Sequence, residues 1–256
     1  QELKVVLQQI LSAGFFSNQE IGRSFSKNLP KFESPYLEAA ILTASNMHYD
    51  EIIKTIPTER KIFEQLIQVG IKEHRSALNK RVDDIYRNSN TLKKLQFSRL
   101  WMKAMRKAGI DLDKMEKNGF FGQEMKLKKI LRNAENLALN SKANIQLRLE
   151  AIETISLGSL LHSNSTSVLK ELIKPNNQSI LRYKAIDSVA NMSKNEPAKM
   201  LLAAWPSLIG EGRKKTLDVL LSRPLWQEEL LQAMETNAIS LSGFPLLHRD
   251  RLLNSN

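Results

Sequence analysis

One hexapeptide pattern recurs three times in the second half of this chain: Arg, two variable residues, a small residue or Thr, Ile or Leu, and an acid. The three copies are RLEAIE at residues 148–153, RYKAID at residues 182–187 and RKKTLD at residues 213–218. Their arginines are 34 and then 31 residues apart. A spacing in this range is typical of a structural unit that is used repeatedly, because each unit buries its apolar face against the next. The pattern therefore constrains the architecture more than the chemistry.

Apolar residues recur at helical spacing along nearly the whole chain. SPYLEAAILTAS places Ser34 at an N-cap and Pro35 at the first helical position, and DEIIKTI, from Asp50, predicts a short separate helix. A further helix begins at Thr91 and ends at Gly109. Paired helices then follow at residues 144–156, 165–173, 178–192, 197–208, 212–221 and 224–236. No segment shows the strict alternation of a half-buried strand, so we predict an all-α fold.

The unit length and the hexapeptide resemble HEAT repeats, which are pairs of packed helices. We therefore expect a right-handed α-α superhelix, a HEAT- or armadillo-like solenoid, with an irregular half at residues 1–122 and a regular half at residues 123–256. The small fourth residue lets neighbouring helices approach, and the aliphatic fifth residue fills the space between units. The charges at the first and sixth positions have two interpretations: solvated helix faces, or an inter-repeat ladder in which Asp187 meets Arg213. The ladder residues would be Arg148, Arg182, Asp187, Arg213 and Asp218.

The positive charge of the chain is concentrated in its middle third. Between Glu59 and Lys142 there are 20 Lys or Arg against 10 Asp or Glu, whereas the rest of the chain holds 18 against 17. A basic surface on a HEAT-like array would bind phosphates without reading sequence. A basic nucleic-acid-binding module, located in the cytoplasm, is therefore the alternative function. Its candidate interaction patch is Lys103, Arg106, Lys107, Lys126, Lys128 and Lys129.

Residues that could carry chemistry are few. Cysteine is absent, which excludes disulfides, thiolate metal sites and haem attachment through Cys-x-x-Cys-His within this chain. The histidines, His48, His74, His162 and His248, lack the spacing that places two metal ligands on one helix face. We therefore assign no catalytic, cofactor-binding or metal-binding residues.

The aromatic residues also favour a structural role. We expect Trp205 and Trp226 to pack in the core rather than bind a partner. A HEAT-like base-excision glycosylase would need a catalytic Asp in an aromatic-lined cleft, and Trp and Tyr are too sparse here to favour it.

Three motifs near the end of the chain resemble the repeat region of a known family. They are Trp205-Pro206, Arg223-Pro224-Leu225-Trp226 and the Arg-x-x-Leu-Leu-type segment RDRLL at residues 249–253. This pattern is similar to the HEAT-repeat region of planctomycete-type multidomain c-type cytochromes, the putative membrane-bound dehydrogenases. The segments SPYLEAAILTAS and IFEQLIQVG resemble the same region.

The resemblance implies a function for the chain as part of a larger protein. It implies an exported, periplasmic protein with a β-propeller dehydrogenase-like module before this segment and a haem c domain after it. The chain itself would be a non-catalytic scaffold whose partners are domains of the same parent chain. We expect no membrane span, because no run of about 18 apolar residues is present.

Overall fold

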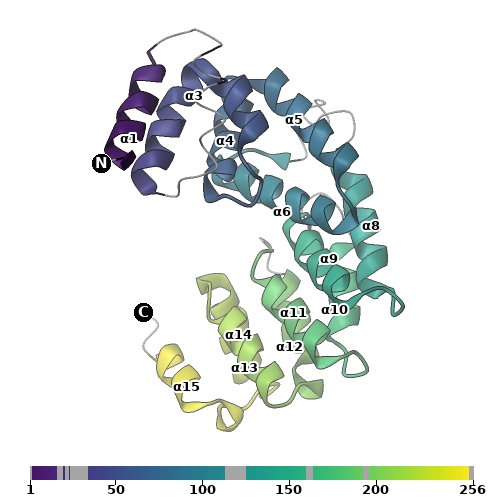
Figure 1. The fold of residues 1–256 in the computed structure, drawn as a ribbon. Helices are drawn as coiled ribbons and strands as arrows, with labels where there is room; N and C mark the ends of the chain where they lie inside the picture. Colours follow the sequence, from purple (N-terminus) through teal and green to yellow (C-terminus); the bar gives the residue numbers. More distant parts are fainter. Residues whose placement is uncertain are drawn as a thin grey trace. The chain divides into compact units, whose positions relative to one another are not determined.

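The computed structural model describes residues 2–15, 20, 23, 34–112, 125–159, 164–192 and 196–253. All regular secondary structure in these ranges is helical, so the all-α prediction is confirmed (Figure 1). The chain forms two compact units, Gln1–Lys126 and Leu127–Asn256. The boundary expected between residues 122 and 123 lies outside the described residues.

The first unit is built from helices that pack on both their sequence neighbours and the next helix but one. Helix α1 packs against α3, α3 packs against α4 and α5, and α4 packs against α5 and α6. The first unit therefore has the two-layered packing of paired helices. The helices are α1 (Glu2–Ala13), α3 (Pro35–Thr55), α4 (Lys61–Lys72), α5 (Arg75–Asn88) and α6 (Thr91–Lys107).

Helix α3 consists of two helical segments joined across a kink, in agreement with the separate short helix predicted from Asp50. It runs from Pro35 to Thr55 and is interrupted at His48, whose φ of −123° and ψ of 25° are not helical. The buried His48 ring donates a hydrogen bond from Nε2 to the carbonyl oxygen of Ala13, 2.9 Å away at the end of α1. This contact uses one of the carbonyl groups that a helix end leaves unpaired, and it explains the bend.

Aromatic side chains fill the centre of the first unit. The Phe97 ring lies between the rings of Phe63, Tyr86 and Trp101, with centroid distances of 6.2, 5.9 and 6.1 Å. The Tyr86 hydroxyl hydrogen-bonds with Ser98, and burial raises the pKa of this phenol. At the end of α6, Gly109 has a φ of 69°, the left-handed conformation that favours glycine after a helix.

The second unit consists of two layers of helices. One layer contains α8 (Leu127–Leu139), α10 (Ser165–Ile173), α12 (Glu196–Ala204) and α14 (Pro224–Glu235). The other contains α9 (Ile145–Leu157), α11 (Ser179–Val189), α13 (Glu211–Leu220) and α15 (Leu246–Leu253). Helix α11 packs between α9 and α13, and α10 and α12 are neighbours in the first layer (Figure 1). These bounds agree with the paired helices expected from the sequence to within a few residues.

The recurring hexapeptides lie on α9, α11 and α13, of which α11 packs against the other two. The fourth and fifth residues of every copy are completely buried. This burial agrees with the packing role predicted for the small and aliphatic positions. The residues are Ala151, Ala185 and Thr216 at the fourth position and Ile152, Ile186 and Leu217 at the fifth.

Thr216 is the one hydroxyl at a position that the other two hexapeptides fill with Ala. Its Oγ1 is buried and has no hydrogen-bond partner among the described residues. Replacing Thr216 by Val keeps the shape and removes a desolvated hydroxyl, so we expect a gain of about 1 kcal/mol in the free energy of unfolding. Urea unfolding followed by circular dichroism measures this change.

The matched control is Thr154→Val, on α9. The Thr154 Oγ1 is equally buried but donates to the carbonyl oxygen of Glu150 at 2.8 Å. This substitution removes a formed hydrogen bond and should not stabilise the protein. Equal effects of the two substitutions on the free energy of unfolding would contradict the view that the unpaired hydroxyl of Thr216 destabilises the fold.

Candidate functional site

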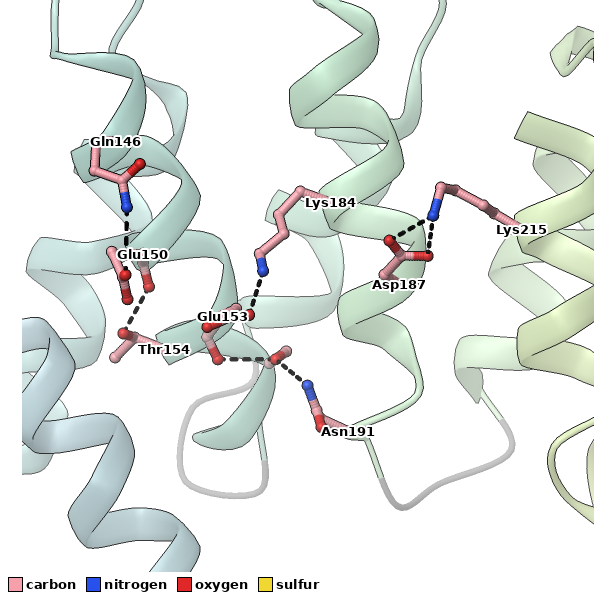
Figure 2. Close-up of polar contacts among 9 residues, drawn as sticks. Gln146, Glu150, Glu153, Thr154, Lys184, Asp187, Asn191 and Lys215 are labelled. Carbon is pink, nitrogen blue, oxygen red and sulfur yellow. Dashed lines mark hydrogen bonds and ion pairs between the residues drawn. The ribbon is translucent and has the colours of Figure 1, made fainter. Parts of the chain in front are cut away.

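The most regular polar feature of the second unit is a set of ion pairs between successive helices of one layer. We call the helices of this layer, α9, α11, α13 and α15, the inner helices. Lys184 on α11 pairs with Glu153 on α9, and the Nζ of Lys215 on α13 contacts both carboxylate oxygens of Asp187 on α11, at 3.1 and 2.9 Å (Figure 2). At the last step, Asp218 on α13 accepts from Arg251 on α15 at 3.1 Å. We call this set the inter-repeat ladder.

The inter-repeat ladder follows the hexapeptide closely. In each step the sixth residue of one copy pairs with the third residue of the next. Residues 249–254 (RDRLLN) act as a partial fourth copy, with Arg249 in first place and Arg251 in third, although Leu252 and Asn254 depart from the pattern. The chain separations of the pairs are 31, 28 and 33 residues. The ladder therefore links each repeat to the next at one equivalent position.

Arg213, which the sequence analysis paired with Asp187, lies elsewhere. Its guanidinium carbon lies 5.1 Å from the centre of the Trp205 ring, and Lys215 occupies the expected place beside Asp187. The physical reason is helical geometry. Residues two apart on a helix point in different directions, so the third-position Lys215 and not the first-position Arg213 reaches the acid on the preceding helix of this layer.

The first-position arginines contact the segment that leads into their own helix. The Nε of Arg148 donates to the carbonyl oxygen of Ala138 at 3.0 Å, near the end of α8. Arg182 donates through Nη1 to the carbonyl oxygen of Pro175 at 3.2 Å. In the fourth copy, Arg249 donates to the carbonyl oxygens of Phe244 and Ser242, both at 3.0 Å. A cation at a helix end or turn satisfies carbonyl groups that the helix leaves unpaired.

Arg148 differs from the other arginines in its burial. Only 6% of the residue is exposed, and this burial lowers the pKa of its guanidinium. Its hydrogen bond to Ala138 therefore holds a desolvated charge at the junction of α8 and α9. Arg148, Arg182, Arg213 and Arg249 thus act within repeats, whereas Asp187 and Asp218 act between them.

The pair of Lys215 and Asp187 predicts a pH dependence. The hydrogen bond that Lys215 donates to Asp187 raises the pKa of Lys215. Because this pKa is higher in the folded chain, the stabilisation is complete below the unfolded-state value of about 10.4 and is lost as pH rises through the folded-state value. Lys215→Met should lower the free energy of unfolding by less than about 1 kcal/mol at pH 7, because Asp187 is half exposed. The difference from the unsubstituted chain should shrink at alkaline pH.

The control for this prediction is the same substitution in an Asp187→Asn background. Without the carboxylate, Lys215→Met should have no such pH-dependent effect. Denaturant unfolding of the four proteins at neutral and alkaline pH gives the coupling directly. A coupling energy that is unchanged at alkaline pH would contradict the ion pair between Lys215 and Asp187 as the source of this stabilisation.

The candidate basic patch lies on two helices that belong to different units. Lys103, Arg106 and Lys107 are on α6, Lys126 is the last residue of the first unit, and Lys128 and Lys129 are on α8. Lys103, Lys107, Lys126, Lys128 and Lys129 are exposed, and Arg106 is partly buried. Lys107 forms an ion pair with Glu64 on α4 at 2.8 Å. One member of the patch therefore also stabilises the packing of α6 on α4.

Histidine and tryptophan side chains have structural contacts. His48 joins α1 to α3, His74 stacks on Tyr49 at 4.6 Å, and His248 contacts Asp218 at 3.1 Å. His162 lies outside the described residues. Trp101, Trp205 and Trp226 are buried, as core packing requires.

The described residues offer neither a cluster of metal ligands nor a membrane-spanning helix. No group of three or more His, Cys, Asp or Glu residues suited to a metal ion occurs in the part of the chain that the structure describes. Across the same residues, no helix is both long and apolar enough to cross a membrane.

The sequence analysis missed the cations of the inter-repeat ladder, Lys184, Lys215 and Arg251. Their signal was the basic third residue in RYKAID, RKKTLD and RDRLLN. The first copy has Glu150 at this position, so the three hexapeptides considered together do not share a basic third residue.

Comparison of the chain with protein-family models, with curated proteins and with solved structures finds no match.

Proposed function

We propose that this chain is a non-catalytic, HEAT-like α-solenoid scaffold that positions other protein domains. The observation that carries the proposal is the inter-repeat ladder. The acid in sixth position of each hexapeptide pairs with a cation on the next inner helix. Arg148, Arg182 and Arg249, in first position, donate to carbonyl oxygens that precede their own helices. Recurring polar residues used in this way support rigidity and register of the array.

The proposal extends to the parent protein through the sequence resemblance. We place the scaffold in an exported, periplasmic multidomain c-type cytochrome or membrane-bound dehydrogenase-like protein, between a dehydrogenase-like module and a haem c domain. This part rests on the motifs Trp205-Pro206, Arg223-Pro224-Leu225-Trp226 and RDRLL. The cofactor haem c would be attached to the neighbouring domain through its own Cys-x-x-Cys-His motif.

The purified chain provides the test. We expect no haem absorbance after expression with the c-type haem maturation system, and no turnover of sugars or alcohols with an artificial electron acceptor. We expect binding to the separately expressed haem domain of the parent, measured by calorimetry. Turnover by the pure chain would refute the scaffold role, and failure to bind the haem domain would refute the placement beside it.

One observation favours nucleic-acid binding as a second candidate function. Helix α6 carries Lys93, Lys94, Arg99, Lys103, Arg106 and Lys107 and contains no acidic residue. We would then expect duplex DNA binding that weakens steeply with salt, in a mobility-shift titration. Replacing Lys103, Arg106 and Lys107 by Glu tests α6, and replacing Lys126, Lys128 and Lys129 by Glu tests α8. No shift at low salt and micromolar protein would exclude this function.

A further inference from the structure

The inner helices of the second unit all begin at the same edge. Glu153 pairs with Lys184, and further along both helices Ser156 accepts from Asn191, so α9 and α11 run in the same direction (Figure 2). The turns that precede α9, α11, α13 and α15 therefore follow one another along the unit (Figure 1). We call this row the turn edge; it comprises residues 140–144, 174–178, 205–210 and 236–245, with the first turn of each following helix.

Large aliphatic side chains are exposed at every step of the turn edge. The exposed fractions are 38% for Ile145, 51% for Ile180, 77% for Ile209, 72% for Leu246 and 65% for Leu247. In each repeat the aliphatic residue stands two to four positions before the hexapeptide arginine. These side chains belong to turns and to the first turns of helices.

Basic groups surround these aliphatic side chains. Arg182, Arg213 and Arg249 contact carbonyl oxygens or an aromatic ring, and such neutral partners leave the positive charge uncompensated. Lysines add to them: the basic residues of the edge outside α9 are Lys142, Lys174, Arg182, Arg213, Lys214 and Arg249. The acids beside them are Glu171, Glu211, Glu235 and Asp250, fewer than the basic residues; Glu171 pairs with Lys174 and Glu211 with Lys214.

The four helix starts add a further positive potential, because the N-terminal end of a helix carries a partial positive charge. The turn edge thus combines projecting aliphatic tips with excess positive charge. This combination is complementary to the surface of an anionic lipid bilayer, where apolar tips enter the headgroup boundary and cations attract acidic headgroups.

We propose that the turn edge of the second unit is a peripheral binding surface for anionic lipid membranes. The side chains that enter the bilayer are Ile180, Ile209, Leu246 and Leu247. The charge that attracts it is the excess of lysines and arginines over acids along the edge. The inference goes beyond the scaffold role and does not depend on it, because a scaffold that binds no lipid can still hold protein domains.

The test is flotation of the full chain with large unilamellar vesicles. We expect binding to phosphatidylcholine vesicles that contain about 30% phosphatidylserine, and little binding to phosphatidylcholine alone. The triple variant Ile209→Ser, Leu246→Ser, Leu247→Ser should bind the anionic vesicles at least about tenfold more weakly. Lys142→Glu with Lys174→Glu should weaken binding severalfold and reduce its dependence on salt.

The matched control is Leu225→Ser with Leu231→Ser, which removes two exposed aliphatic side chains from α14, outside the turn edge. Circular dichroism checks that every variant is folded. Unchanged binding by the control together with loss in the turn-edge variant supports the proposal.

Three outcomes overturn the proposal. They are no binding to anionic vesicles, equal binding to neutral and anionic vesicles, and equal loss in the α14 control. An acidic leucine-containing peptide tests the competing occupant. If the chain binds this peptide and not vesicles, and the turn-edge variant abolishes that binding, the edge is a protein-docking surface instead.

Discussion

Gly70→Ala should lower the free energy of unfolding of the first unit by about 3 kcal/mol, although alanine is normally the better helix residue. A Cβ at this position would lie 2.0 Å from the hydroxyl oxygen of Tyr49 and 2.6 Å from its Cζ. The Tyr49 ring has little freedom to move away. Its hydroxyl donates to the carbonyl oxygen of Leu66 at 2.7 Å, and its ring stacks on His74.

Displacing Tyr49 would also leave a buried polar group without its partner. Tyr49 is 1% exposed, and burial raises the pKa of its phenol, so the hydroxyl stays protonated and available as a donor. Losing that hydrogen bond adds to the cost of the steric overlap. The loss therefore exceeds the gain in helix propensity.

Urea unfolding followed by Trp101 fluorescence measures this effect, in a Trp205→Phe, Trp226→Phe background that leaves one tryptophan in the first unit. Gly212→Ala on α13 is the control, because its Cβ would meet no atom closer than 3.4 Å; since it lies in the second unit, its unfolding is followed by far-ultraviolet circular dichroism. Tyr49→Leu should relieve part of the cost of Gly70→Ala, since it removes the atoms that collide. If Gly70→Ala proves neutral, the close contact with Tyr49 is not what requires glycine here.

Trp226→Ala should destabilise the second unit by about 4 kcal/mol, because it empties a large volume in a fully packed site. Only 1% of Trp226 is exposed. The Arg223 guanidinium lies 4.3 Å from the centre of the ring, and it donates to the carbonyl oxygens of Met192 and Ala190, at the end of α11. The tryptophan thus supports an arginine that joins α14 to α11.

The measurement for Trp226→Ala is urea unfolding followed by far-ultraviolet circular dichroism. Trp226→Phe should cost clearly less, since it keeps an aromatic ring below Arg223. The neighbouring Leu225→Ala, at a half-exposed position, should change stability by less than about 0.5 kcal/mol. A Trp226→Ala variant as stable as the Leu225→Ala variant would mean that the ring does not contribute to the core.

These two predictions differ in how far the sequence anticipated them. The buried role of Trp226 follows from its position at a helix start and from the general burial of large aromatics. The need for glycine at position 70 does not follow from the sequence. It depends on Tyr49, 21 residues away on another helix, which points into the space that a Cβ would occupy.

In the hexapeptide, too, the sequence anticipated one part of the structure and not another. The hexapeptide predicted repeat packing, and its fourth and fifth residues are indeed completely buried. It also suggested that charges pair between repeats. The partner of Asp187 is nevertheless Lys215 and not Arg213, because two residues along a helix turn a side chain to a different neighbour.

The bend in α3 is a comparable case. The sequence predicted DEIIKTI as a helix separate from SPYLEAAILTAS, and the structure has two helical segments joined across a kink at His48. The sequence did not show that His48 hydrogen-bonds with the end of α1, 35 residues earlier. Such a contact between distant residues leaves no periodic signal in the sequence.

By itself, the sequence determined that this protein is all-α, where its paired helices lie, and which apolar residues separate one repeat from the next. Periodicity carries this information, because the burial of one helix face depends on residues three and four apart. Only the tertiary structure decided which charges meet, why Gly70 must lack a side chain, and that exposed aliphatic side chains gather along the turn edge. These features depend on the distance and direction between side chains on different helices, which the helical period does not specify.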